Sequence, residues 1–534
     1  MSDELPNATD DARLAELGYK TQFKRGFTLI DATAFSFSIM AVISGVSSTM
    51  GLTIASGGHV GLIWGWLIPV PFVICVAAVM AELASSMPTS AGPYYYAAKL
   101  APKRYAPLAS WVVGGANLTG HVTLLTYIDF ALAQMITTAI AAGTDGRVAL
   151  GHGPTFGLFL AMLVLHGCIC SATTRALARL SLVSAIFTVG ATVAAIIILP
   201  VCTGENRVST RVAFTSYENS TGWSNSGWAF LLAFTGPMWQ LAVSDSAARI
   251  SEETARAAKV APMAMLMSVA CAGCLGWIFN IATSFAVASV PDLLSSPFPL
   301  PMGQLYLDIM GKRGMLAIWC VTIVIQSAWK FMRGAAQGVT ASRVVFAFAR
   351  DNALPGAHQW KKINHYTRTP VNAVWLAVSL AAFFGLLGFS SIAMTSAACA
   401  TVIGLYTSYA IPILLRITTG RNKFVPGPFS LGRWSTPMGT IAIAWIAFVI
   451  LLLCFPRTQS PHTSNMNYAV VLTMGISILA YGVWAFSARN WFTGPLQNID
   501  DNDSNNTTVT AFYNASDKEA SGEMSENAKS TQGL

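Results

Sequence analysis

Long apolar stretches separated by short polar segments make up most of the chain. Stretches of about 20 predominantly apolar residues, the length that crosses a bilayer as a helix, occur twelve times. The predicted spans are 28–55, 60–86, 107–140, 155–173, 177–202, 227–248, 263–289, 314–348, 371–389, 392–416, 437–455 and 467–488. The pattern predicts an all-α integral membrane protein, because helices satisfy their own backbone hydrogen bonds in lipid.

Two of the predicted spans contain residues that interrupt a regular helix. The first reads "FSIMAVISGVSSTMGL", and its small polar residues predict a break over 44–49. The sixth reads "FLLAFTGPMWQLAVSD", where Gly236 and Pro237 predict a second break because proline removes one helical hydrogen bond. Breaks at matching places, five spans apart, are typical of inverted-repeat transporters whose unwound backbone lines a binding site. The alternative is that each break only kinks its helix.

Composition supports a membrane transporter and argues against other classes. Only 10% of residues are charged and 54% are hydrophobic, whereas a soluble domain has roughly 25% charged residues. The basic residues are scattered between spans, so no nucleic-acid partner is expected. The cysteines lie mainly in apolar runs, and no metal or cofactor is expected. The chain has no HExxH, GxSxG or P-loop motif, which argues against an enzyme.

Charge asymmetry between the loops predicts the orientation of the chain. Lysine and arginine are more frequent in the loops on one predicted side of the membrane, and the positive-inside rule then places both termini in the cytoplasm. Asn219 begins a glycosylation sequon in a predicted outer loop. Residues 1–26 and 491–534 are polar and are predicted to be disordered cytosolic extensions.

Three motifs resemble one transporter family. Trp64–Ala98 ("WGWLIPVPFVICVAAVMAELASSMPTSAGPYYYAA") resembles the second-span signature of the amino acid, polyamine and organocation (APC) transporter superfamily. Thr340–Pro355 ("TASRVVFAFARDNALP") resembles its motif closing span eight, and Ser251–Pro262 ("SEETARAAKVAP") resembles its acidic loop after span six. Together they resemble the fungal amino acid/choline transporter family, whose members carry GABA, choline, basic amino acids or polyamines.

The resemblance implies a fold and a binding site. The fold would be a LeuT-like five-plus-five inverted repeat with helices 1 and 6 broken, in which 27–202 is the first repeat, 227–416 the second and 437–490 two extra helices. The substrate would lie among the residues of the two breaks, Ser44, Gly45, Val46, Ser47, Thr235, Gly236, Pro237, Met238 and Trp239. Free amides at the helix breaks would bind a substrate carboxylate. Trp239 would stack on an ammonium or alkyl group, or would only fill the break.

Ionisable residues inside spans are functional candidates because burying them in lipid is costly. Glu82 and Asp245 are candidates for gating or proton coupling, or for pairing with Arg343 or Arg350. Four others depart from what the resemblance implies: His121 and Asp129 in span three, and Lys330 and Arg333 in span eight.

Three hypotheses stay open for these four residues. In the first, Asp129, His121 and Lys330 line the pathway and set specificity, Asp129 serving as counter-ion for a cationic substrate. In the second, Lys330 occupies the place where a sodium-coupled relative would hold its ion. In the third, the cations of span eight pair with the groups of span three as structural contacts.

The sequence therefore predicts a secondary active permease. We expect its substrate to be an amino acid, choline, GABA, a polyamine or a related organic amine, moved with protons or by exchange. The alternatives are a transporter of an amine-type specialised metabolite and a nutrient sensor of transporter fold; the short polar tails argue against the sensor. The plasma membrane is the expected location, with the vacuolar membrane as the alternative.

Overall fold

The computed structural model is helical throughout the part of the chain that it describes. It describes residues 14–17, 19 and 25–495, apart from 173, 328–332, 368, 460–461 and 463–465. These residues form helices and loops and contain no strand beyond one isolated parallel bridge, between Phe27 and Thr254. Residues 23–495 form one unit; of the other unit, 1–22 and 496–534, only residues 14–17 and 19 are described.

The helices follow the apolar pattern of the sequence. Those before residue 210 are α2 (Leu29–Met40), α3 (Val42–Leu67), α4 (Pro69–Ser86), α5 (Pro93–Leu100), α6 (Ala106–Gly143), α7 (His152–Cys170) and α8 (Thr174–Thr203). Next come the short helices α9 (Thr210–Thr215), α10 (Ser226–Leu232), α11 (Thr235–Leu241) and α12 (Ser246–Arg249), and the 3₁₀ turn η2 (Ser251–Glu253). The remainder are α13 (Ala257–Ala286), α14 (Val290–Leu294), α15 (Pro301–Ser327), α16 (Arg333–Arg350), α17 (Ala357–Trp360), α18 (Val371–Gly385), α19 (Ser391–Ile417), α20 (Ser435–Cys454) and α21 (Ala469–Phe486).

Nine helical segments among the described residues are long and apolar enough to cross a membrane. One of them, Leu29–Ser86, covers the first two predicted spans. Predicted span six does not qualify, because the structure divides it into α10, α11 and α12. Predicted span eight includes residues 328–332, which lie outside the described part of the chain. The count of twelve spans and the inverted repeat therefore remain predictions.

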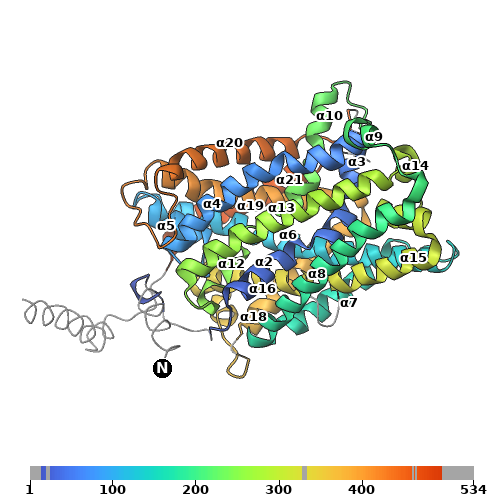
Figure 1. Ribbon diagram of the computed structural model, residues 1–534. Helices are drawn as coiled ribbons and strands as arrows, with labels where there is room; N and C mark the ends of the chain where they lie inside the picture. The colour runs from blue at the N-terminus through green and yellow to red at the C-terminus, as the bar shows by residue number, and fades with distance from the viewer. Residues whose placement is uncertain are drawn as a thin grey trace, which may run out of the picture. The chain divides into compact units, whose positions relative to one another are not determined.

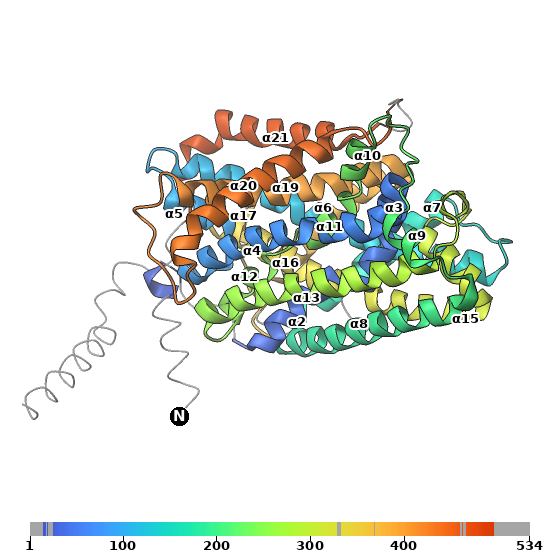
Figure 2. The ribbon, with the colours of Figure 1, turned by 45° about the horizontal axis from the view of Figure 1, so that its top comes forward.

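Helix α6 lies inside the bundle that residues 23–495 form. It packs against α7, α15, α16, α18 and α19, and Figures 1 and 2 show it among these helices. On the other side, α13 packs against α2, α3, α4 and α8. By contrast, α21 lies at the edge of the unit in Figure 2 and exposes large apolar side chains. Polar side chains on the inward faces of α6 are therefore shielded from lipid by other helices.

Buried ion pairs hold the segment around η2 to α16. Arg343 Nε donates to Glu253 Oε1 (2.6 Å), and Arg350 Nη1 donates to Glu252 Oε2 (3.3 Å). The same segment pairs with the chain before the first helix, because Phe27 N donates to Glu253 O (3.1 Å). Arg343 and Arg350 therefore pair with Glu253 and Glu252, and the predicted alternative that they pair with Glu82 or Asp245 is wrong.

The Glu252 carboxylate is stabilised in its charged form. It accepts hydrogen bonds from Ser90 N (3.0 Å), Ser90 Oγ (2.7 Å) and Thr89 Oγ1 (3.1 Å). Burial by itself would raise the pKa of Glu252, but the Arg350 guanidinium and the Ser90 hydrogen bonds outweigh it and lower this pKa below its ordinary value. The loop before α5 is thereby joined to η2 and α16.

Candidate functional site

The first helix break lies at Ala41. This residue has a left-handed backbone (φ 32°, ψ 77°) that ends α2 and begins α3. Ser44 and Ser47 lie instead in the first turns of α3, where their hydroxyls donate to Ala41 O (3.2 Å) and Ile43 O (2.6 Å). The predicted break over 44–49 is therefore wrong, because hydroxyls that bond to the preceding turn are compatible with a helix.

The second break lies at residues 242–245, between α11 and α12. Gly236 and Pro237 are in the first turn of α11, and only a short turn separates them from α10. A proline near a helix start removes an N–H that has no partner within the helix, so it does not unwind the chain there. The predicted break at Gly236 and Pro237 is therefore wrong in position, although the sixth span is broken.

The two breaks lie side by side because α3 and α11 pack antiparallel. Gln240, near the end of α11, donates from Nε2 to Val42 O (3.4 Å) and lies so close to Gly45 that a Cβ there would overlap its amide. At the other end of α11, a Cβ on Gly236 would overlap the Thr53 hydroxyl. The end of α11 therefore meets the beginning of α3.

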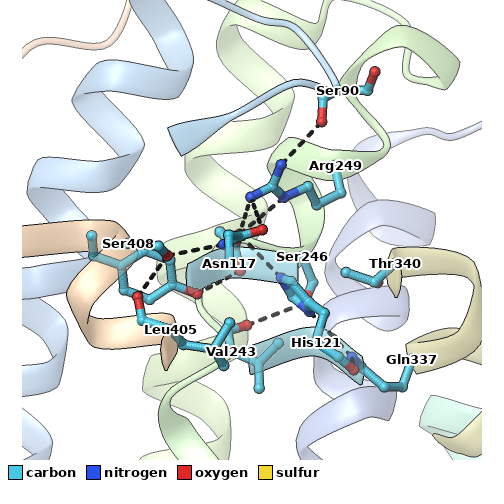
Figure 3. Close-up of polar contacts among 12 residues, drawn as sticks. Ser90, Asn117, His121, Val243, Ser246, Arg249, Gln337, Thr340, Leu405 and Ser408 are labelled. Atoms are coloured by element: carbon cyan, nitrogen blue, oxygen red, sulfur yellow. Dashed lines mark hydrogen bonds and ion pairs between the residues drawn. The ribbon is translucent and has the colours of Figure 1, made fainter. Parts of the chain in front are cut away.

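Asp245 is the centre of a buried polar network beside the breaks. Figure 3 shows three members of this network, His121, Asn117 and Arg249. Its Oδ1 accepts from the Tyr409 hydroxyl (2.6 Å). Its Oδ2 accepts from Arg249 Nε (3.0 Å) and faces His121 Nε2 at 3.5 Å. All four side chains are fully buried. The acid of the broken segment is thus held by groups from α6, α12 and α19.

Arg249 connects Asp245 to two other parts of the chain, the loop before α5 and helix α6. Its Nη1 donates to Ala91 O (2.7 Å) and Ser90 O (3.2 Å), and its Nη2 donates to Asn117 Oδ1 (2.6 Å). The loop approaches this guanidinium at Gly92, where φ is +56° and a Cβ would lie 2.9 Å from Arg249 Cζ. Only glycine adopts that backbone without strain and leaves room for the guanidinium.

His121 is held as a neutral imidazole by its second partner. Gln337 Nε2 donates to the His121 main-chain O (2.9 Å) and to its Nδ1 (3.1 Å). Because Nδ1 accepts a hydrogen bond, the ring proton is on Nε2, the atom that faces Asp245. The span-three residue His121 is thereby joined to both the broken segment and α16.

An aromatic contact closes the other side of α11. The rings of Trp239 and Tyr127 meet edge to face, with centroids 4.8 Å apart. Met238 Sδ accepts from the Tyr406 hydroxyl at 3.7 Å. Trp239 therefore packs on α6, and the predicted stacking of Trp239 on a substrate remains a prediction.

The geometry brings two opposite helix ends together. The first turn of α3 has no side-chain cap, and it carries the positive end of the helix dipole. The end of α11 presents carbonyl groups and the negative end of its dipole. A small molecule that carries both charges is the ligand that such a pair of ends suits.

Comparison with known proteins places the chain in a family. A sequence model of the amino acid permease family matches residues 27–476. The chain belongs to this family. An amino-acid permease of Arabidopsis thaliana is 34% identical to this permease over 500 residues, covering 91% of this chain and 96% of the relative. A GABA-specific permease of Saccharomyces cerevisiae is 32% identical over 510 residues, covering 94% of this chain and 88% of the relative.

These matches confirm the coarse functional predictions. Permeases are transport proteins, so the expectation that the chain is a multi-pass membrane transporter and not an enzyme is confirmed. The resemblance to the APC superfamily and to GABA permeases is confirmed as well. The substrate of this permease, its coupling ion and its binding residues remain proposals.

Asp129 does not join the network around Asp245. It lies two turns further along α6 than His121, and its Oδ1 accepts from His166 Nδ1 of α7 at 2.8 Å. The predicted contact with Lys330 or Arg333 stays a prediction, because Lys330 and the Arg333 side chain lie outside the described residues.

Glu82 of α4 takes part in a separate polar cluster. Its Oε2 accepts from Ser435 Oγ (2.5 Å) and lies 3.6 Å from Arg416 Nε. Its Oε1 accepts from Ser430 Oγ (3.2 Å) and Leu431 N (3.2 Å). Glu82 therefore ties α4 to the segment before α20, and its predicted role in gating or coupling remains a prediction.

The sequon residue Asn219 lies in the loop between α9 and α10. Its Nδ2 donates to Trp223 O (2.8 Å), and its Oδ1 accepts from Thr221 N (2.9 Å) and Thr221 Oγ1 (2.6 Å). The asparagine side chain is half-buried. Its glycosylation remains a prediction.

Sequence reasoning missed several residues of the network. Sequence reasoning does not single out Arg249, Asn117, Gln337 or Tyr409 of this network, nor His166, the partner of Asp129. Asn117 lies one turn before His121, and this i, i+4 spacing on one face of a span was a usable signal. The other residues come from distant segments, and nothing in their local sequence indicates these partners.

Proposed function

We propose that this permease carries a zwitterionic amino acid, of the α type or the ω type that GABA represents. The proposal takes its substrate class from the names of the relatives, which include amino-acid permeases and a GABA-specific permease. Within that class, the charge balance around the two breaks favours zwitterions over choline and polyamines.

The substrate carboxylate would bind at the beginning of α3, to the amides of the turn that follows Ala41. The ammonium would bind to carbonyl groups at the end of α11 and in residues 242–244. The antiparallel packing of α3 and α11 supports this arrangement, because it brings the two oppositely polarised ends together.

One observation favours a zwitterion: both carboxylate oxygens of Asp245 already accept hydrogen bonds from the protein. Its two oxygens accept from Tyr409 and Arg249, and the Arg249 guanidinium balances its charge. The His121 imidazole adds no charge. The described residues around the breaks therefore carry no net charge, and a cation would enter this buried site without a counter-ion, which is costly. A zwitterion brings both charges with it.

The membrane arrangement is part of the proposal. We infer twelve spans, arranged as a five-plus-five inverted repeat with two further helices, in the plasma membrane or the vacuolar membrane, and with both termini in the cytoplasm. The bridge between Phe27 and Thr254 supports an even number of crossings between them, because paired residues lie on one side of the membrane. Transport would be coupled to protons or to exchange.

Uptake of labelled compounds by the reconstituted protein tests the substrate class. We expect GABA or neutral α-amino acids to enter vesicles about tenfold faster than choline or putrescine, because a neutral buried site penalises an uncompensated charge by a few kcal/mol. Empty vesicles are the control. Choline or putrescine uptake as fast as that of any zwitterion would contradict the proposal and favour a carrier of an amine-type metabolite. Binding of an amino acid without uptake would favour the sensor.

A further inference from the structure

The pair formed by Asp129 and His166 is a second buried ionisable site, separate from the substrate breaks. Asp129 is fully buried in α6 and His166 is 1% exposed in α7. Asp129 Oδ1 accepts from His166 Nδ1 at 2.8 Å, whereas Asp129 Oδ2 has no hydrogen-bond partner in the part of the chain that the structure describes. An ionised carboxylate with one unpaired oxygen is costly to bury.

The other two acids buried in spans are held differently. Asp245 pairs with Arg249 at 3.0 Å and Glu82 lies 3.6 Å from Arg416. An arginine stays charged at all physiological pH values, so it keeps its partner ionised. Both acids also fill their two oxygens with hydrogen bonds. Asp129 has a titratable histidine in place of an arginine, and one oxygen left open.

Among the described residues, no arginine pairs with Asp129 in the way that Arg249 pairs with Asp245 and Arg416 with Glu82. The Cys170 thiol of α7 interacts electrostatically with both Asp129 and Arg343 of α16. Arg343 is itself paired with Glu253 at 2.6 Å. The contacts from α15 and α18 are neutral: Gln326 Nε2 donates to Ile128 O, and Thr126 Oγ1 donates to Ala381 O.

We propose that Asp129 and His166 form the proton-binding site of this permease, with Asp129 Oδ2 as the atom that takes up the proton. With His166 neutral and Asp129 ionised, a proton from water forms an O–H bond at Asp129 Oδ2 and removes the negative charge of the pair. The return of that proton to water on the other side breaks the O–H bond and restores the charge. Nothing is oxidised or reduced. The inference rests on the proposed function, since it assigns the coupling ion of the same transport.

The position of the pair links it to the substrate site. Asp129 and His121 lie eight residues apart on one continuous helix, which is about 12 Å. Helix α6 therefore carries both the proton-binding carboxylate and the imidazole that faces Asp245. A change in the charge of Asp129 alters how α6 packs against α7, and the same helix contacts the broken segment.

Asp129→Asn in reconstituted protein tests the assignment, because asparagine keeps the size and removes the proton-binding group. We expect exchange of labelled for unlabelled substrate to stay within about threefold of wild type, because exchange needs no net proton movement. Substrate-driven proton entry and uptake driven by a pH gradient should fall at least about tenfold. Asp129→Glu should restore part of the proton entry and part of the uptake driven by the pH gradient. Thr137→Ser, a conservative change on α6, is the matched control.

Infrared spectroscopy gives a readout that needs no transport. Wild-type protein should develop a carboxylic-acid C=O band as the pH falls. That band should be absent in Asp129→Asn, and in His166→Gln it should appear at a different pH. The proposal is overturned if the band persists in Asp129→Asn, or if this variant still moves protons with substrate. Parallel loss of exchange, uptake and folded protein would instead assign the pair a structural role. Wild-type uptake without proton movement would refute only the proton site, and wild-type failure to exchange any amino acid would refute the proposed function.

Discussion

A single alanine, Ala41, holds the conformation that creates the first break. Its positive φ of 32° costs a residue with a Cβ about 1–3 kcal/mol, and surrounding structure must compensate for that strain. Ala41 is fully buried where α2 ends and α3 begins. Such strain often marks a functional position, since it holds backbone groups in an arrangement that a regular helix does not offer.

Two substitutions at Ala41 separate backbone conformation from side-chain packing. Valine strongly disfavours positive φ, so Ala41→Val should straighten the break and reduce uptake at least about tenfold. Glycine adopts positive φ easily, so Ala41→Gly should keep most of the activity. Initial uptake rates, normalised to the amount of protein at the cell surface, measure this. Equal loss in both variants would mean that the conformation of Ala41 is not what matters.

At the scale of helices, the sequence indicated which spans are broken but not where. Gly236 and Pro237 are the residues most unfavourable to a helix in span six, yet both are accommodated at the start of α11. The unwound residues 242–245 contain no proline or glycine. They are unwound because Asp245 bonds to Tyr409 and Arg249 bonds to the loop before α5. Tertiary contacts between distant residues decide this position, and local propensity does not report them.

The contact between η2 and α16 gives a prediction about stability and pH. Arg350→Gln would leave the buried Glu252 carboxylate without its cation, and breaking a buried ion pair costs about 3–5 kcal/mol. The folded-state pKa of Glu252 is lowered. The ionised Glu252 carboxylate therefore stabilises the fold at a pH above its ordinary pKa, and this stabilisation is lost as the pH falls through the lowered pKa. The variant should therefore be less stable than wild type at pH 7, and the difference should shrink in acid.

Thermal unfolding of purified protein in detergent, measured at neutral and acid pH, checks this. Arg433→Gln is the matched control, since Arg433 is exposed and lies over Trp434; surface changes of this kind cost less than about 0.5 kcal/mol. A loss of stability in Arg350→Gln that does not depend on pH would argue that Arg350 acts through packing alone.

At the scale of the whole molecule, the apolar pattern and three motifs were enough to predict the class and the family. Predicted spans 107–140 and 437–455 lie close to α6 (Ala106–Gly143) and α20 (Ser435–Cys454), because long apolar stretches have no other stable form in lipid. The sequence did not allow a prediction of which residues contact the buried polar and charged side chains. His121 and Gln337 are 216 residues apart, and Ser90 and Arg249 are 159 apart.

The orientation of the molecule can be tested at Asn219. Its Nδ2 uses one hydrogen for Trp223 O, which leaves the other position for a glycan. If the loop between α9 and α10 faces the outside, protein from a eukaryotic host should shift in size after endoglycosidase treatment. Asn219→Gln should abolish that shift, and Thr221→Ser, which preserves the sequon, should retain it. An unmodified wild-type protein at the cell surface would count against the predicted orientation.

The bridge between Phe27 and Thr254 also constrains how the protein is made. The two residues are 227 positions apart (254 − 27), and ribosomes add about 5–20 residues per second. Phe27 therefore leaves the ribosome roughly 11–45 s before its partner exists. During that interval the segment before α2 lacks the contact that later fixes it, so it is exposed to chaperones and proteases until Thr254 has been made.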